Sequence, residues 1–235
     1  MMTDGATRLR ERKTLSQEVA GIIKERIRSG EFEQGERIVE SRLAREVGLS
    51  LTPVREAVRE LVGEGILTVM PNRGPSVRIL EPDDAFELYT LRAQLEGLAI
   101  RLAIRRNSIP ARQQIADILT DMEQQADDPA VTSLHGASRR IHLGIVHLSG
   151  HERLIALYTS LDLQVALLDR LVAATSSKQH EVDWHRPLID VLLGDDVDRA
   201  QAVIMEHIRE SYETYLQQYQ VRQATTNESL DHDWM

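Results

Sequence analysis

The chain of 235 residues contains no cysteine, and aromatic residues make up only 4% of it. The absence of cysteine excludes disulfides and cysteine-ligated zinc sites, and it fits the reducing cytoplasm in which we expect the protein. No apolar run approaches the roughly 18 residues that a membrane-spanning helix needs, and the first residues lack the apolar core of a signal peptide. We therefore expect no membrane association. The scarcity of aromatics, together with abundant Leu, Ala, Arg and Glu, favours helix.

The chain is also short of positive charge, with a formal net charge of −9. Taken over the whole chain, this balance argues against a nucleic-acid partner. The excess of negative charge nevertheless lies after residue 80. Residues 1–80 carry 14 Lys and Arg against 12 Asp and Glu, whereas the remaining residues carry 14 against 25. This asymmetry is typical of a near-neutral DNA-reading head on an acidic body, in which local arginines contact phosphate.

Residues 40–65 have the pattern of two short helices joined by a tight turn. A first apolar stripe stops at Gly48, because glycine adopts a positive φ at little cost. Ser50 or Thr52 can cap a second helix, which has Pro53 in its first turn and ends near Gly65. Two short helices connected in this way predict a helix-turn-helix.

Two stretches with strand character follow, at residues 66–70 and 76–80, and a tip that contains Arg73 and Gly74 separates them. A hairpin directly after the second helix predicts a winged helix-turn-helix. We place this domain at residues 15–80, with a supporting helix at residues 15–29 and a further short strand at residues 37–39.

The exposed side of this region carries residue types that suit DNA. Hydroxyl groups hydrogen-bond to phosphates or bases, and an arginine makes two parallel hydrogen bonds to a guanine edge or a phosphate. The predicted DNA-contacting residues are Arg42, Ser50, Thr52, Arg55, Arg59, Arg73 and Gly74. The alternative is a helix pair that packs only for structure, with solvated arginines.

This region resembles the GntR family of bacterial transcription regulators. The resemblance is carried by Leu43-Ala44, Thr52-Pro53-Val54-Arg55-Glu56-Ala57-Val58, Leu61, Glu64-Gly65-Ile66 and Arg73-Gly74. It implies double-stranded DNA with a palindromic operator as the partner. Leu51 departs from the family, which usually has arginine there, so one contact is missing or is shifted to Arg42, Arg55 or Arg59. The operator sequence therefore does not carry over.

From residue 83 onward the pattern predicts only helices, so the expected fold class is mainly α, a winged helix-turn-helix followed by an all-α bundle over residues 83–221. The six expected helices span about residues 83–106, 110–126, 130–149, 152–174, 179–193 and 195–219. Residues 1–14 are expected to be a disordered basic arm, which either touches DNA or is an inert tail. Residues 222–235 are expected to be a flexible tail.

The C-terminal half resembles the FCD branch of the GntR family, in which this domain binds an effector and dimerises. The resemblance is carried by Arg92-x-x-Leu95-Glu96, Ile141-His142, Ser149-Gly150, His185, Gly194-Asp195 with Ala200, and His207-Ile208. It implies a homodimer and a small organic acid, such as a sugar acid or a carboxylate metabolite, as the effector.

Three histidines share helix faces with apolar neighbours, so they are predicted to point into the bundle from different helices. They are His142, His185 and His207. Three inward neutral imidazoles can converge on one zinc, nickel or copper ion. The alternative is three separate core histidines, each with its own hydrogen-bonding partner. The family resemblance implies the first reading, with these three as metal ligands.

The family often has aspartate four residues before the first of these histidines, and this chain has Ser138 there. A neutral hydroxyl is a poor ligand, so one negative ligand is lost and a bound Zn or Ni is weakened. Either water, the effector or His135 supplies a fourth ligand, or no metal binds.

A charged effector needs an anchor, and guanidinium binds carboxylate bidentately. The predicted effector-binding residues are Arg92, Ser138 and Arg139, with Arg140 as a further candidate. For Arg92 the alternative is a plain surface pair with Glu96, which follows it at i+4.

Three functions stay open. The first is a DNA-binding transcriptional repressor that a small organic acid controls, directly or through a metal. The second is a metal-dependent hydrolase in which the three histidines activate water. No acid–base motif such as HExxH accompanies them, so we expect no enzyme. The third is a protein-interaction module without DNA binding, which an affinity indifferent to salt would favour.

Overall fold

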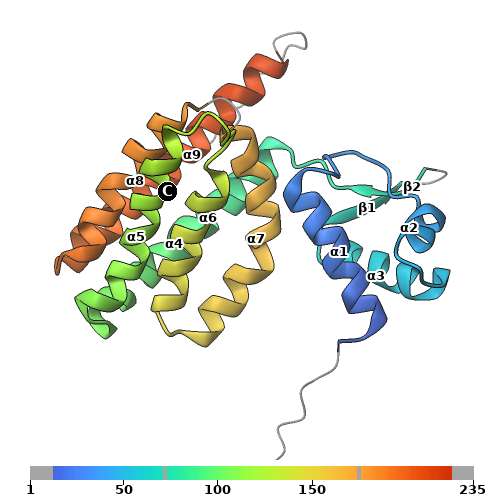
Figure 1. The fold of residues 1–235 in the computed structure, drawn as a ribbon, viewed down its shortest axis with the longest axis horizontal. Helices are drawn as coiled ribbons and strands as arrows, with labels where there is room; N and C mark the ends of the chain where they lie inside the picture. The colour runs from blue at the N-terminus through green and yellow to red at the C-terminus, as the bar shows by residue number, and fades with distance from the viewer. Residues whose placement is uncertain (1–12, 71–72, 174–175, 224–235) are drawn as a thin grey trace, which may run out of the picture. The chain divides into compact units, whose positions relative to one another are not determined.

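The computed structural model describes residues 13–70, 73–173 and 176–223. The predicted flexible tail and the predicted basic arm lie almost wholly outside these residues, as do two residues at the wing tip. The described residues form nine helices and a two-stranded sheet (Figure 1). The chain divides into two compact units between Ile79 and Leu80. The fold class is mainly α, as predicted.

The first unit is built on three helices, α1 (Leu15–Ser29), α2 (Glu40–Glu46) and α3 (Leu51–Gly63). Gly48, with a φ of 68°, makes the turn between α2 and α3. Ser50 is the N-cap residue of α3, but its side chain makes no capping hydrogen bond within the described residues, so that part of the prediction is wrong. Packing holds α3 instead: its buried side chains lie against α1, and its opposite face is left to solvent.

The wing is the hairpin of β1 (Leu67–Met70) and β2 (Gly74–Val77), which pair antiparallel. Gly74 lies opposite Met70 and has a φ of 75°, so β2 starts earlier than the predicted residue 76. The pairing ends where Val77 meets Leu67, and the predicted extension of the strand to residue 80 is therefore wrong. The segment before α2 contributes a single bridge, between Arg37 and Ser76, rather than a strand.

The second unit consists of six helices in its described residues. They are α4 (Pro82–Arg106), α5 (Ile109–Ala126), α6 (His135–Leu148), α7 (Glu152–Ala173), α8 (Lys178–Leu193) and α9 (Val197–Gln223). Helix α6 begins later than the predicted residue 130, because side chains hold the preceding backbone in turns. Asp128 Oδ1 accepts from the Ala130 amide over 2.8 Å, and Ser133 Oγ accepts from the His135 amide over 3.2 Å.

Helix α4 has a central place in this unit, since it contacts α6, α7, α8 and α9 (Figure 1). Side chains that point inward from these helices therefore meet beside α4. The contacts are close: a Cβ added at Gly97 of α4 would lie 3.3 Å from side-chain atoms of Gln201 and Met205 on α9. Within the described part of the chain, the helices are too short or too polar to cross a membrane.

Candidate functional site

The predicted DNA-contacting residues lie on the solvent-exposed side of the first unit. Arg42, Ser50, Thr52, Arg55, Arg59 and Arg73 are exposed, and Gly74 is half-buried. Three groups of them can be distinguished by element, with one on α2, four at or within α3, and two at the wing. The other side of α3 is buried through Pro53, Val54, Ala57, Val58 and Leu61. The apolar face thus packs α3 into the first unit, and its polar face stays exposed to solvent.

Two of these arginines carry surface ion pairs. Arg55 Nε lies 3.4 Å from Glu40 Oε2, and Arg42 Nε lies 2.8 Å from Glu46 Oε1. Both arginine side chains are more than half exposed. Exposed pairs of this kind contribute little to stability, so either guanidinium can exchange its carboxylate for a phosphate.

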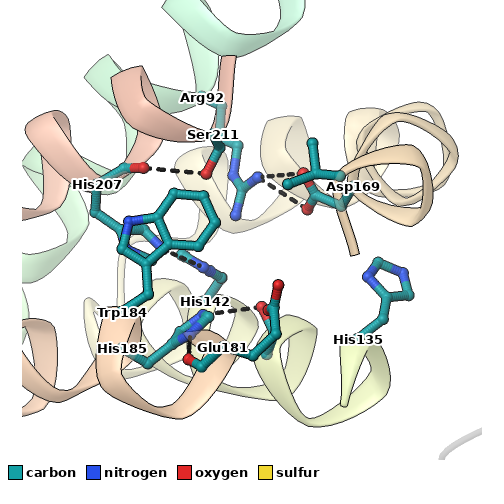
Figure 2. A pocket seen from close by; sticks show the side chains of 11 residues that line it. Arg92, His135, His142, Asp169, Glu181, Trp184, His185, His207 and Ser211 are labelled. Atoms are coloured by element: carbon teal, nitrogen blue, oxygen red, sulfur yellow. Dashed lines mark hydrogen bonds and ion pairs between the residues drawn. The ribbon is translucent and has the colours of Figure 1, made fainter. Parts of the chain in front are cut away.

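In the second unit the structure brings the three predicted histidines together (Figure 2). His142 comes from α6, His185 from α8 and His207 from α9. All three are buried, and one ring nitrogen of each lies within 4.8 Å of the others. The ring centroids are 4.7–5.5 Å apart. We name these three residues the histidine cluster.

Hydrogen bonds fix two of the imidazoles. Nδ1 of His142 lies 2.6 Å from Glu96 Oε2, and Nδ1 of His185 lies 2.7 Å from the Glu181 carbonyl oxygen. Both partners are acceptors at neutral pH, so each Nδ1 carries a hydrogen, and Nε2 is the nitrogen left to face the other rings. Nε2 of His142 is only 3.3 Å from Nε2 of His207. That contact is a hydrogen bond, so one of the two nitrogens carries a hydrogen. Nδ1 of His207 has no partner among the described residues, and transfer of the hydrogen to it would turn both Nε2 atoms into potential metal ligands.

Burial also keeps His185 and His207 in the protonation state that binds metal. It lowers the pKa of His185 to about 3, reinforced by the neighbouring His142, and it holds the pKa of His207 well below its usual range. Neutral imidazole is the form that ligates zinc and nickel. The chemistry of these donors therefore fits a divalent transition metal.

Ser138 lies beside the cluster, at the position where the family resemblance leads one to expect an aspartate. Its Oγ lies 2.9 Å from Nε2 of His185. Since that nitrogen is the unprotonated one, the serine hydroxyl donates to it. Ser138 thus hydrogen-bonds a potential ligand atom and brings no negative charge to the cluster.

A buried ionic network supports the cluster from α4 and α7. Arg92 is only 2% exposed; its Nε donates to Glu96 over 2.7 Å, and its Nη1 donates to both Asp169 oxygens over 2.9 and 3.0 Å. The predicted alternative, a surface pair between Arg92 and Glu96, is therefore wrong. Hydroxyl groups complete the network: Tyr158 donates to Glu96 over 2.7 Å, and Tyr89 donates to Asp169 over 2.9 Å.

This network keeps its charges despite burial. Burial opposes ionisation of Glu96, but His142 and Arg92 outweigh it and lower the pKa of Glu96 to about 2. Burial likewise opposes the charge on Arg92, and the carboxylates of Asp169 and Glu96 outweigh it, so the pKa of Arg92 is raised. The helix that carries His142 is thereby tied to α4 by an ionised carboxylate.

The histidine cluster opens into a small cavity (Figure 2). It is lined by Arg92, His135, Ser138, His142, Asp169, Val172, Glu181, Trp184, His185, His207 and Ser211. Its volume is about 20 Å³, counted over positions that the centre of a water-sized molecule can occupy. That is room for an ion with a water or two, and a larger ligand has to widen it.

Two predicted residues lie away from the cluster. His135 lines the cavity, but no nitrogen of its ring belongs to the group of three within ligand range of one another. Arg139 lies outside the cavity lining, and its guanidinium binds Asp162 of α7, with Nε donating to Oδ1 over 2.8 Å. Of the predicted effector residues, Arg92 and Ser138 line the cavity.

Five of the lining residues were not predicted from the sequence: Asp169, Val172, Glu181, Trp184 and Ser211. Glu181 had a local signal, because it stands four residues before His185 and so shares its helix face. Asp169 had none, because its partner Arg92 lies 77 residues away in the chain.

Each of the two units matches a known protein family. Residues 15–77 match the family described as bacterial regulatory proteins, gntR family, and residues 87–210 match the FCD domain. The Nta operon transcriptional regulator of Aminobacter aminovorans is 32% identical over 79% of this chain and 87% of its own length. The probable D-xylose utilization operon transcriptional repressor of Paenarthrobacter nicotinovorans is 27% identical over 87% of this chain and 90% of its own.

Solved structures share the fold. E. coli McbR/YncC matches with a TM-score of 0.75 and 22% identity, over 88% of this chain and all of its own. A putative GntR transcriptional regulator from Rhodococcus sp. RHA1 matches with a TM-score of 0.73 and 19% identity, over 86% of this chain and 97% of its own. At these identities the likeness concerns the arrangement of the helices and the wing.

Proposed function

Because the chain belongs to the GntR family of bacterial regulatory proteins and carries an FCD domain, we propose that it is a transcriptional repressor released by a small organic acid. That it is a transcriptional regulator follows from the family; the repression and the effector are our proposal. One observation carries it. The same chain combines an exposed, arginine-bearing helix α3 with a buried cavity that three histidines line.

In this proposal a homodimer places two copies of α3 in successive major grooves of a palindromic operator. The first turns of α3 present Thr52 and Arg55 to the bases and phosphates, and Arg42, Arg59 and Arg73 contact the backbone around them. The exposure of these side chains supports this role. With arginine absent at Leu51, base reading falls mainly to Arg55.

The effector site is the cavity of the second unit. His142, His185 and His207 would hold a divalent transition metal, zinc or nickel, which when bound supplies a Lewis-acidic centre for a carboxylate. Arg92 uses Nε and Nη1 within the network, which leaves Nη2 for the acid. Ser138 adds a hydroxyl next to the cluster. The small cavity supports an acid of few atoms or one whose binding moves the helices.

The alternatives receive less support. A hydrolase is not favoured, because the gntR family and the relatives named above are described as regulators. A module that binds only protein is not favoured for the same reason, since the first unit matches a family of DNA-binding regulators over residues 15–77.

The proposal is tested by selecting genomic fragments with the purified protein and measuring their affinity by fluorescence anisotropy. We expect an enriched palindrome whose affinity falls steeply with salt. Arg55→Ala should weaken binding by about 1–3 kcal/mol, whereas Arg105→Ala, an exposed arginine at the end of α4, should not. Equal binding by both variants would remove Arg55 from the reading face, and failure to enrich any fragment would overturn the DNA role.

The control by ligand is tested on the same complex. Zinc-loaded protein bound to its operator is titrated with a panel of small carboxylates, and we expect at least one to release the DNA. By reciprocity, the operator should weaken the binding of that acid by the same factor. An acid that binds without changing DNA affinity would contradict the proposed coupling.

A further inference from the structure

We propose that Glu181 is the carboxylate ligand of the metal centre and takes the part that Ser138 cannot play. The inference rests on the proposed metal site at the histidine cluster, and it assigns that site a fourth protein ligand. The centre would then consist of three imidazoles and one carboxylate.

The burial of Glu181 is the first observation that carries this assignment. Its side chain lines the same cavity as the histidine cluster, and the residue is only 6% exposed (Figure 2). Its Oε1 has no hydrogen-bonding partner among the described residues. A buried carboxylate oxygen without a partner is costly, so a ligand that supplies one is expected.

The spacing along α8 is the second observation. Glu181 stands four residues before His185, just as Ser138 stands four residues before His142 on α6. Side chains at i and i+4 lie one above the other on a helix, which is the spacing of paired metal ligands on one helix face. The two helices thus offer equivalent places beside the cluster, and the carboxylate is on α8.

The charges around the cavity exclude the other carboxylate that lines it. Asp169 is bound by Arg92 through two hydrogen bonds and by the Tyr89 hydroxyl. Arg92 is in turn shared with Glu96, so this cation is already balanced by two anions. Glu181 forms no ion pair within the described part of the chain, and a divalent cation would be its counter-charge.

The backbone of Glu181 already serves the cluster. Its carbonyl oxygen accepts the hydrogen bond from Nδ1 of His185 and so directs Nε2 of that ring inward. Ligation requires a change of the Glu181 rotamer, since its carboxylate is not yet within the close group of ring nitrogens. It also requires Ser138 to release Nε2 of His185.

Zinc affinity tests the assignment directly. Full-length protein is freed of metal with a chelator, and its affinity for Zn²⁺ is measured by competition with a chromophoric chelator. Glu181→Gln keeps the shape of the side chain and removes its charge. We expect it to weaken Zn²⁺ binding by at least the roughly 10–100-fold that loss of an outer partner costs, because a direct ligand is lost. The matched control is Asp183→Asn, an exposed carboxylate on the same helix, which should leave the affinity unchanged.

A rescue separates ligation from a structural effect. Adding Ser138→Asp to Glu181→Gln restores a carboxylate on the opposite helix, so affinity should return towards the wild-type value. Co²⁺ substituted for Zn²⁺ should show visible absorption of a four-coordinate site in the wild type and in the rescued double variant, and a changed spectrum in Glu181→Gln.

The outcomes are distinct. Wild-type Zn²⁺ affinity and an unchanged Co²⁺ spectrum in Glu181→Gln would overturn the role of Glu181 and leave the three-histidine site intact. Absence of Zn²⁺ binding by the wild type, with or without binding by Ser138→Asp, would overturn the proposed metal site itself and the inference with it. Cooperative urea unfolding and unchanged helical circular dichroism of every variant report that its second unit, which is helical in its described residues, is folded.

Discussion

Glu96 of α4 accepts a hydrogen bond from Nδ1 of His142 on α6 over 2.6 Å, and both side chains are buried. The same carboxylate binds Arg92 and the Tyr158 hydroxyl, so its position is determined from three sides. The orientation of His142 is thus set by Glu96, a residue of another helix. Glu96 binds Nδ1 of the ring, whereas Nε2 is the nitrogen that faces the other cluster histidines.

Glu96→Gln should therefore weaken metal binding without removing a ligand. The substitution takes away the negative charge that Nδ1 of His142 hydrogen-bonds. Outer partners of this kind typically contribute about 10–100-fold in affinity, so we expect a loss of that size. Competition for Zn²⁺ measures it. Glu87→Gln, at an exposed position of α4, is the control; equal affinities of the two variants would show that Glu96 has no influence on the site.

Arg92→Met should destabilise the second unit strongly. It leaves the buried carboxylates of Glu96 and Asp169 without their cation, and breaking a buried pair in this way costs about 3–5 kcal/mol. Urea unfolding at neutral pH measures the change. Arg209→Met breaks only surface pairs with Glu206 and Glu213 and should cost less than about 1 kcal/mol. Similar costs for the two variants would contradict the importance of the buried network.

Metal-free Glu181→Gln should gain stability over the wild type as pH rises from 4.5 to 7. Burial raises the pKa of Glu181 to about 7 in the folded protein, partly opposed by a hydrogen bond from Ser176, against 4.5 for the unfolded group. The folded state then binds more protons, so the wild type loses stability as pH rises through this window, and the glutamine variant does not.

Histidine titration acts in the opposite direction but is common to both proteins. His185, with its pKa lowered to about 3, loses its contribution as pH falls below 6.5. It therefore cancels when the two proteins are compared at each pH. The measurement is urea unfolding at pH 5 and at pH 7.5, and an equal stability difference at the two values would refute the titration of Glu181.

Arg73→Ala should weaken DNA binding almost equally for all sequences. The exposed side chain lies at the wing, where we place it on the phosphate backbone. Removing one phosphate contact lowers the magnitude of the slope of log K against log salt by about 1. Anisotropy titrations on the operator and on an unrelated duplex give both slopes; a loss confined to the operator would indicate base reading instead.

His142→Ala combined with His185→Ala should leave a protein without bound metal that still binds DNA. Two of three ligands are gone, while the first unit is unchanged in sequence. Elemental mass spectrometry of the untagged protein measures the metal, and anisotropy measures the DNA affinity. Metal retained by the double variant would place it outside the histidine cluster.

The sequence predicted what depends on local patterns. The helices, the wing and the inward direction of the three histidines follow from apolar periodicity and from Gly48 and Gly74, which act over a few residues. The start of α6 could not be read, because Asp128 and Ser133 bind nearby backbone amides in place of helix formation.

The buried network shows a second limit of sequence analysis. An arginine and a glutamate at i and i+4 look the same whether they face water or the core, so Arg92 and Glu96 were open to a surface reading. Their burial is decided by Asp169 and Tyr158, which come from α7 and are distant in the chain. The partner of Arg139 could not be predicted for the same reason, since Asp162 also lies on α7.

The three cluster histidines are separated along the chain by residues 143–184 and 186–206. An ion held by them would act as a cross-link that closes two loops at once and so removes conformational freedom from the unfolded chain, as a disulfide does in proteins that contain cysteine. A chain without cysteine would acquire in this way a reversible tie between α6, α8 and α9, and its tightness would follow the supply of metal. Amide hydrogen exchange would record the tie as slower opening of these three helices.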